Sequence, residues 1–126
     1  MIPRHIKEVI DYSIKNYPCV ILTGPRQVGK TTLLSNDYAT GSFNYVTLDN
    51  YSDRLLAKND PQTFLEIHPY PLIIDEAQKA PELFPELEYI INEKRRIEGS
   101  KKANGLYILS GSNRKEILES TKITRK

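Results

Sequence analysis

Residues Gly24–Thr32 read GPRQVGKTT, and they follow the short apolar run CVIL at Cys19–Leu22. The stretch fits the pattern G-x-x-x-x-G-K-[ST], in which a glycine-rich turn joins a strand to a helix. Backbone N–H groups in such a turn form a nest for an anion, and the helix that follows directs the positive end of its dipole to the same place. This stretch therefore predicts an α/β fold with a phosphate-binding loop after its first strand.

The positions of this loop have different expected roles. Gly24 and Gly29 form the turn, the Lys30 ammonium reaches the β- and γ-phosphates of a nucleotide, and the Thr31 hydroxyl is a ligand of Mg²⁺. The alternative interpretation is an ordinary Gly/Pro turn before a helix. The residues that we expect to contact the nucleotide are Gly24, Pro25, Arg26, Gln27, Val28, Gly29, Lys30, Thr31 and Thr32.

The composition is that of a soluble protein, with 126 residues, 39% hydrophobic and 27% charged. We expect one domain over residues 1–126. No stretch approaches the roughly 20 apolar residues of a transmembrane helix, and the N-terminus lacks the apolar segment of a signal peptide, so we expect a cytoplasmic protein without a membrane partner.

Cys19 lies within the apolar run and is expected to be a buried small hydrophobe. No Cys and His cluster has the spacing of a structural zinc site.

The charge is divided unevenly along the chain. Residues 1–93 carry eight Lys/Arg and thirteen Asp/Glu, whereas residues 94–126 carry ten and three. The basic part could contact nucleic acid or an acidic partner, or it could be a solvated face or tail. Tyr107 is the only aromatic residue among these charges, so a base-stacking surface has little support.

Strand and helix patterns alternate along the chain with short connections, which predicts a mainly parallel sheet of about four strands in a three-layer α/β/α arrangement. Apolar residues at helical spacing indicate a first helix around Ile6–Ile14. Asp60 and Pro61 mark the start of a later helix. We expect strands at Cys19–Thr23, Phe43–Asn50, Pro71–Asp75 and Gly105–Ser110, and further helices at Gly29–Asn36, Asp53–Lys58, Gln62–Ile67, Pro81–Arg96 and Arg114–Glu119.

Two adjacent acids, Asp75 and Glu76, end the apolar run of the third strand. Open α/β sheets bind their ligands at the carboxyl ends of the strands. Adjacent residues on a strand point to opposite faces, so we expect different roles for the two acids. Asp75 would hold Mg²⁺ through a water, and Glu76 would orient or polarise the water that attacks the γ-phosphate. The alternative is a strand that ends in two exposed acids.

A polar cluster of Ser110, Ser112 and Asn113 ends the fourth strand. If this strand lies beside the loop strand, one of these side chains can hydrogen-bond the γ-phosphate or the attacking water and so detect an intact nucleotide. A plain Ser/Gly turn is the competing interpretation, and the sequence does not separate Ser110 from Ser112.

Gln78, two residues after Glu76, either contacts this cluster or starts the loop that follows the two acids. His5 and His68 have no acid or nucleophile arranged around them, so we interpret both as structural or surface residues.

Together these segments resemble a family of prokaryotic AAA-type ATPases. The matching segments are GPRQVGKTTLL at Gly24–Leu34, YVTLDN with RLLAKNDPQTFL at Arg54–Leu65, PLIIDEAQKAPELFPEL at Pro71–Leu87 and YILSGSN at Tyr107–Asn113. The resemblance implies an additional-strand ATPase core in which the fourth strand inserts between the first and third. It also implies that Lys30 and Thr31 are the phosphate and magnesium residues, Asp75 and Glu76 the metal-binding and catalytic acids, and Ser110 or Ser112 the sensor.

The chain departs from the resemblance after Asn113. Members of the family look much longer, with a fifth strand, an arginine-bearing segment and a C-terminal domain, whereas this sequence stops at Glu119–Lys126 without a fifth apolar strand. The first strand would then lie at an exposed edge. We expect either a truncated product or a partner that completes the sheet. Arg114 and Arg125 are the candidates for an arginine that neutralises transition-state charge.

The leading hypothesis from these residues is a domain that binds ATP and Mg²⁺ and hydrolyses ATP to drive a conformational change in a larger protein or complex. The alternative is a nucleotide-responsive interaction module that binds ATP without efficient hydrolysis. A GTPase has less support, because the nearest string to a guanine-reading [NT]-K-x-D segment is TKIT at Thr121–Thr124, which lacks the acid. The sequence leaves open whether the chain acts as a monomer or in an oligomer.

Overall fold

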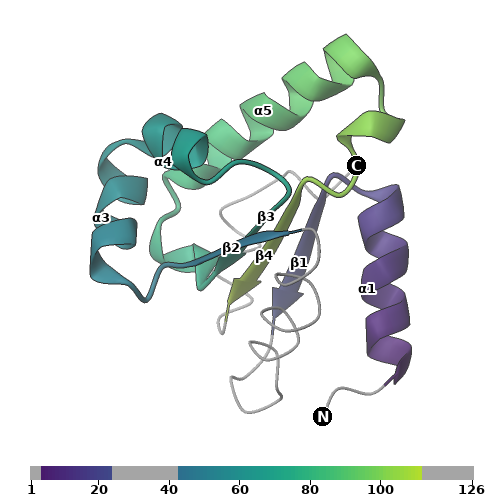
Figure 1. Ribbon diagram of the computed structural model, residues 1–126, viewed down its shortest axis with the longest axis horizontal. Coiled ribbons are helices and arrows are strands. Elements are labelled where there is room, and N and C mark those ends of the chain that lie inside the picture. Colours follow the sequence, from purple (N-terminus) through teal and green to yellow (C-terminus); the bar gives the residue numbers. More distant parts are fainter. Residues whose placement is uncertain (1–3, 24–42, 112–126) are drawn as a thin grey trace.

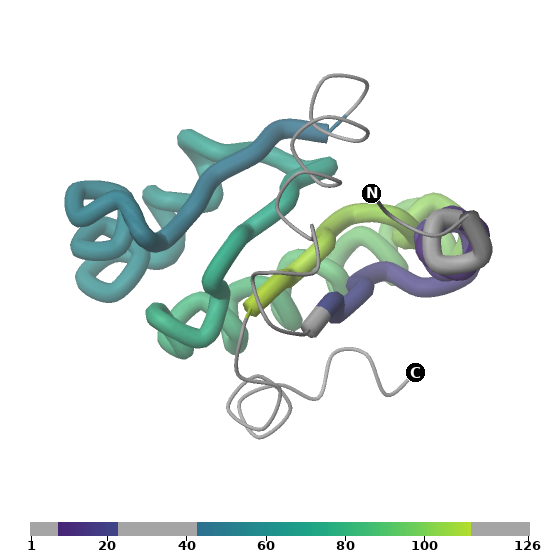
Figure 2. The backbone as a smooth tube through the Cα atoms, turned by 90° about the horizontal axis from the view of Figure 1, so that it is seen from below, coloured from purple at the N-terminus to yellow at the C-terminus, as the bar shows by residue number. Residues whose placement is uncertain are grey.

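The computed structural model describes residues 4–23 and 43–111, including the side chains from residue 8 onward. Four strands form one parallel sheet in the order β1-β4-β3-β2, as Figure 2 shows. The strands are β1 (Cys19–Thr23), β2 (Asn44–Thr47), β3 (Leu72–Asp75) and β4 (Tyr107–Gly111). The predicted α/β class is confirmed, and so is the position of β4 between β1 and β3. In the described part of the chain, β1 lies at one edge of the sheet.

Helices cover both faces of this sheet (Figure 1). Helix α1 (Arg4–Asn16) lies along β1, and α5 (Leu83–Glu98) lies on the other side. The helices α3 (Tyr51–Asn59) and α4 (Pro61–Ile67) pack together near β2, and the short 3₁₀ turns η3 (Ala77–Lys79) and η4 (Lys101–Ala103) flank α5 in sequence. Among the described residues, no helix combines the length and apolar character needed to cross a membrane.

Strand alternation divides the core into two clusters. Ile73 of β3 and Ile108 of β4 pack with Ile10 of α1 on one face. Their strand neighbours face the other side, because successive side chains on a strand point to opposite faces. That second cluster contains Leu72, Ile74, Tyr107 and Leu109 together with α3, α4 and α5 residues, among them Ala57, Phe64, Leu83, Leu87 and Ile91. Both faces of β3 are therefore dry, which agrees with its uniformly apolar sequence.

Local capping explains where the helices of the α3–α4 pair begin. The Asn50 side chain accepts a hydrogen bond from the Asp53 backbone N–H at 3.0 Å, and this contact caps α3. Asp60 caps α4 in the same way through the Thr63 N–H at 3.2 Å, with Pro61 at the first helical position. These contacts satisfy backbone donors that have no partner inside the helix. The predicted role of Asp60 and Pro61 at the start of a helix is confirmed.

A close backbone contact fixes the end of α1 against the start of β4. The Gly105 N–H donates to the Tyr17 carbonyl at 2.9 Å, and a Cβ added at Gly105 would lie 3.0 Å from the Ile14 carbonyl oxygen. Gly105 also has a φ of +71°, a conformation that side-chain-bearing residues rarely adopt. Only glycine fits both conditions, and this contact sets where β4 enters the sheet beside β1.

Candidate functional site

The carboxyl ends of the four strands meet at one edge of the sheet, because all of them run parallel. The backbone register pairs Thr23 of β1 with Gly111 of β4, and Thr47 of β2 with Asp75 of β3. Open parallel sheets bind ligands at this edge. The predicted phosphate loop, Gly24–Thr32, follows Thr23 directly but lies outside the described residues. The roles of Lys30 and Thr31 therefore stay predictions, as do those of Ser112, Asn113, Arg114 and Arg125.

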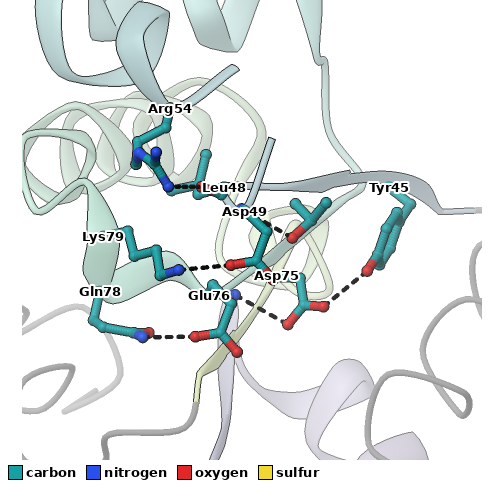
Figure 3. Close-up of polar contacts among 9 residues, drawn as sticks. Tyr45, Leu48, Asp49, Arg54, Asp75, Glu76, Gln78 and Lys79 are labelled. Carbon is teal, nitrogen blue, oxygen red and sulfur yellow. Dashed lines mark hydrogen bonds and ion pairs between the residues drawn. The ribbon is translucent and has the colours of Figure 1, made fainter. Parts of the chain in front are cut away.

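Asp75 is the last residue of β3 and is buried, with only 4% of its surface exposed. Donors from both neighbouring strands and from the turn that follows β3 reach its carboxylate. The Ser110 hydroxyl of β4 donates to Oδ1 at 2.6 Å, and the Glu76 backbone N–H donates to the same oxygen at 3.0 Å. The Tyr45 hydroxyl of β2 donates to Oδ2 at 2.8 Å (Figure 3). The carboxylate is therefore held by hydroxyls from both neighbouring strands.

Glu76 does not continue the strand, and its backbone is left-handed with φ 55° and ψ 46°. The expectation that strand alternation would direct the two acids to opposite faces is wrong in its premise, because β3 ends at Asp75. Glu76 is 2% exposed, and its Oε1 accepts a hydrogen bond from Gln78 Nε2 at 2.7 Å. The alternative of two exposed acids is also wrong. A left-handed conformation costs a non-glycine residue on the order of 1–2 kcal/mol, and such conformations concentrate at functional sites.

The turn after Glu76 is tied to the connection between β2 and α3. Gln78 and Lys79 belong to η3, and Lys79 Nζ lies 2.6 Å from Asp49 Oδ1 (Figure 3). Arg54 of α3 donates to the Leu48 carbonyl at 3.1 Å in the same connection. The Gln78 Oε1 atom is buried and has no hydrogen-bond partner among the described residues. Of the two interpretations of Gln78, the described contact is with Glu76 and not with Ser110 of the β4 cluster.

Ser110 lies in the sheet core with none of its surface exposed. The Ser110 hydroxyl donates its hydrogen bond to the Asp75 carboxylate, and this contact restricts the orientation of Asp75. A contact between Ser110 and a γ-phosphate stays a prediction. Tyr45 was not anticipated from the sequence. The available signal is its spacing of two residues from Thr47, which places the Tyr45 side chain on the face of the sheet that Asp75 shares.

Two further expectations concern residues away from this edge. Cys19 is 1% exposed, and burial raises the pKa of its thiol, so the expectation of a buried small hydrophobe is confirmed. His68 does have an acid beside it, because its Nε2 lies 3.6 Å from Asp53 Oδ1, and its ring packs 4.6 Å from the Phe64 ring. The expectation that no acid lies near His68 is therefore wrong.

Mg²⁺ prefers oxygen ligands, and it is commonly held by one or two carboxylates together with substrate phosphates. The Asp75 carboxylate at the sheet edge has oxygens of the type that such a site needs. In the two described ranges, no group of three or more His, Cys, Asp or Glu side chains could hold a metal ion. Among the residues that the structure describes, the carboxylates therefore fit a metal that is shared with a nucleotide, and no all-protein cage is present.

A family model for an AAA domain matches residues 16–125. The match includes the loop Gly24–Thr32, the acids Asp75 and Glu76, and the polar cluster after β4. No curated protein and no solved structure matches the chain.

Proposed function

Because this chain belongs to the AAA domain family of P-loop ATPases, we propose that it binds ATP with Mg²⁺ and hydrolyses the nucleotide to drive a conformational change in a larger protein or complex. The family indicates a nucleotide-binding, ATPase-type function. The proposal adds the reaction and the residues that perform it. ATP would bind at Gly24–Thr32, with the Lys30 ammonium on the phosphates and the Thr31 hydroxyl as a magnesium ligand.

One observation carries this proposal: Asp75 and Glu76 are buried side by side at the carboxyl end of β3. Taking carboxylates out of water costs several kcal/mol per ion, so a protein retains such a pair where it has a use. The end of β3 lies one strand away from the end of β1, since β4 separates the two. The pair is therefore close to the strand that leads into the phosphate loop.

The two acids support different steps. When bound, Mg²⁺ neutralises charge on the nucleotide phosphates. Asp75 supplies a fixed carboxylate for it, because Ser110 and Tyr45 hold both carboxylate oxygens. Glu76 would accept a hydrogen bond from the attacking water and take its proton when the O–H bond of the water breaks, so that the carboxylate becomes a neutral carboxylic acid. The contact from Gln78 Nε2 occupies one acceptor position of Glu76 Oε1, and the remaining acceptor positions of the carboxylate are the ones that the water would use.

Two substitutions test the proposal separately for binding and for hydrolysis. Lys30→Ala should abolish ATP binding, whereas Lys58→Ala on α3, whose ammonium lies 3.7 Å from Glu82, should leave binding unchanged. Glu76→Gln should preserve ATP binding and reduce turnover by at least about a hundredfold, the scale of general-base catalysis. Glu88→Gln on the exposed side of α5 is its matched control. Normal affinity in Lys30→Ala would remove the nucleotide site, and normal turnover in Glu76→Gln would remove the role of that acid.

The hydrogen bond between Gln78 and Glu76 also favours a second candidate, a nucleotide-responsive interaction module that binds ATP without efficient hydrolysis. In the described conformation, the Glu76 carboxylate is buried and engaged within the protein. Steady-state turnover of the chain separates the two functions. A rate of about 1 per second or faster would exclude the module, and ATP binding with turnover far below that rate would exclude the hydrolase.

A further inference from the structure

We propose that Tyr45 is a positioning residue that orients the Asp75 carboxylate toward Mg²⁺, an inference that rests on the proposed ATP and Mg²⁺ site. Its hydroxyl donates to Asp75 Oδ2 at 2.8 Å, while Ser110 and the Glu76 N–H donate to Oδ1. Tyr45 thus contacts Oδ2, and the other two donors contact Oδ1. The Tyr45 hydroxyl, together with these donors, fixes the rotation of the carboxylate about the Cβ–Cγ bond.

The fold gives Tyr45 this reach through the strand register. Tyr45 pairs with Ile73, and Thr47 pairs with Asp75. Tyr45 therefore lies two residues before the position beside Asp75, and its side chain points to the same face of the sheet. The phenol ring is long enough to span this distance, whereas the Thr47 hydroxyl already accepts the Asp49 N–H at 3.2 Å. Figure 3 shows the Tyr45 side chain directed along the sheet toward Asp75.

Packing holds the Tyr45 ring in this direction. The ring is partly buried against the cluster that contains Phe43, Ile73 and Ile108. A tyrosine has only two side-chain torsions to fix, so a packed ring delivers its hydroxyl at little further entropic cost. The aspartate torsion that turns the carboxylate is intrinsically broad, and without an anchor on Oδ2 the carboxylate samples more orientations.

Loss of this anchor has a specific consequence for the metal. Groups that hydrogen-bond a metal ligand orient it, and their removal typically weakens metal affinity by about 10- to 100-fold. A purely structural hydroxyl would affect folding stability without changing how nucleotide binding depends on Mg²⁺. The Mg²⁺ dependence of binding therefore distinguishes the two roles and does not require turnover.

The test is Tyr45→Phe in the whole 126-residue chain, with a fluorescent ATP analogue followed by anisotropy during a Mg²⁺ titration and in EDTA. We expect the midpoint Mg²⁺ concentration to rise about tenfold, with an unchanged dissociation constant in EDTA. Tyr107→Phe is the matched control, because it removes a phenolic hydroxyl from the first residue of β4, at the end of the sheet opposite to Asp75. A thermal melt of each variant verifies that it is folded.

A double-mutant cycle shows whether Tyr45 acts through Asp75. In an Asp75→Asn background, Tyr45→Phe should produce no further shift of the Mg²⁺ midpoint. An unchanged midpoint in folded Tyr45→Phe, or an equal shift in both backgrounds, overturns the inference and leaves the proposed function intact. A wild-type chain that fails to bind the analogue both with Mg²⁺ and in EDTA overturns the proposed function, and the inference falls with it.

Discussion

The left-handed backbone at Glu76 predicts an unusual order of stabilities among variants at this position. Within the described ranges, Glu76 is the one residue other than glycine with a positive φ. Both Glu76→Gly and Glu76→Ala delete the carboxylate and the hydrogen bond from Gln78. They differ only in the Cβ atom, so a comparison of the two variants isolates the backbone strain from the side-chain contacts.

The size of the difference follows from two opposing terms. A Cβ in the left-handed region costs about 1–2 kcal/mol, which favours the glycine variant. Glycine also has more conformational freedom to lose on folding, which returns about 0.4–1 kcal/mol in favour of alanine. The net expectation is that Glu76→Gly is more stable than Glu76→Ala by about 0.5–1 kcal/mol, or about 2–4 °C in Tm for a chain of this size.

Urea denaturation without nucleotide, followed by circular dichroism, measures this difference. The matched control is the same pair of substitutions at Glu88, an exposed position inside α5. There the order should reverse, with Glu88→Ala more stable than Glu88→Gly by about 1 kcal/mol, because glycine is a poor helix former. If Glu76→Ala equals or exceeds Glu76→Gly while the Glu88 pair behaves as expected, the backbone at residue 76 is not left-handed and the reasoning fails.

Three further measurements test other contacts. Ser110→Ala should lower the free energy of unfolding, measured in urea, by about 1.5–3 kcal/mol, because the Ser110 hydroxyl donates to the buried Asp75 carboxylate. A loss below about 0.5 kcal/mol would contradict that contact. Cys19 should resist a disulfide-exchange reagent such as DTNB in the native protein, since burial shields the thiol and raises its pKa, and it should react only at the rate of unfolding. Rapid labelling of the native protein would refute this expectation. Asn50→Ala should lower the free energy of unfolding by about 1 kcal/mol, because it removes the acceptor for the Asp53 N–H at the start of α3. An unchanged melting temperature would mean that the Asn50 side chain does not stabilise the start of this helix.

Secondary structure was predicted best where one local pattern was sufficient. The predicted strand Cys19–Thr23 coincides with β1, whose apolar run is bounded by Pro18 and Gly24. The expected helix at Pro81 begins instead at Leu83, because the carbonyls of Ala80 and Pro81 accept turn-type bonds from Leu83 and Phe84. A proline followed by apolar periodicity does not distinguish such a turn from the first turn of a helix.

The second strand was predicted too long for a related reason. The expected range was Phe43–Asn50, whereas β2 ends at Thr47. Asn50 leaves the strand to cap α3, and its N–H donates to the Thr47 carbonyl at 3.2 Å. Asx residues compete with regular structure through such local bonds, and the competition is decided by the neighbouring helix.

The acids of the candidate site were predictable, but their partners were not. Asp75 and Glu76 are adjacent in sequence and end an apolar run, which is a local signal. The contacts of Asp75 with Tyr45 and Ser110 span 30 and 35 residues and depend on the register of three strands. The left-handed turn at Glu76 has no local signal either, because glutamate is rarely selected for that conformation.

The two acids are held by different parts of the molecule, and this separates the ways in which each can change. Asp75 is fixed by hydroxyls from β2 and β4, so its carboxylate cannot move far unless strand packing moves with it. Glu76 is held within its own turn by Gln78, and a rotation of one strained residue can redirect its carboxylate. Substitutions in the sheet should therefore act on the acid assigned to the metal, whereas substitutions in η3 should act on the acid assigned to the attacking water. Because the Glu76 N–H also donates to Asp75 Oδ1, the two sets of contacts meet at this bond, and substitutions in both sets should show a coupling free energy in a double-mutant cycle.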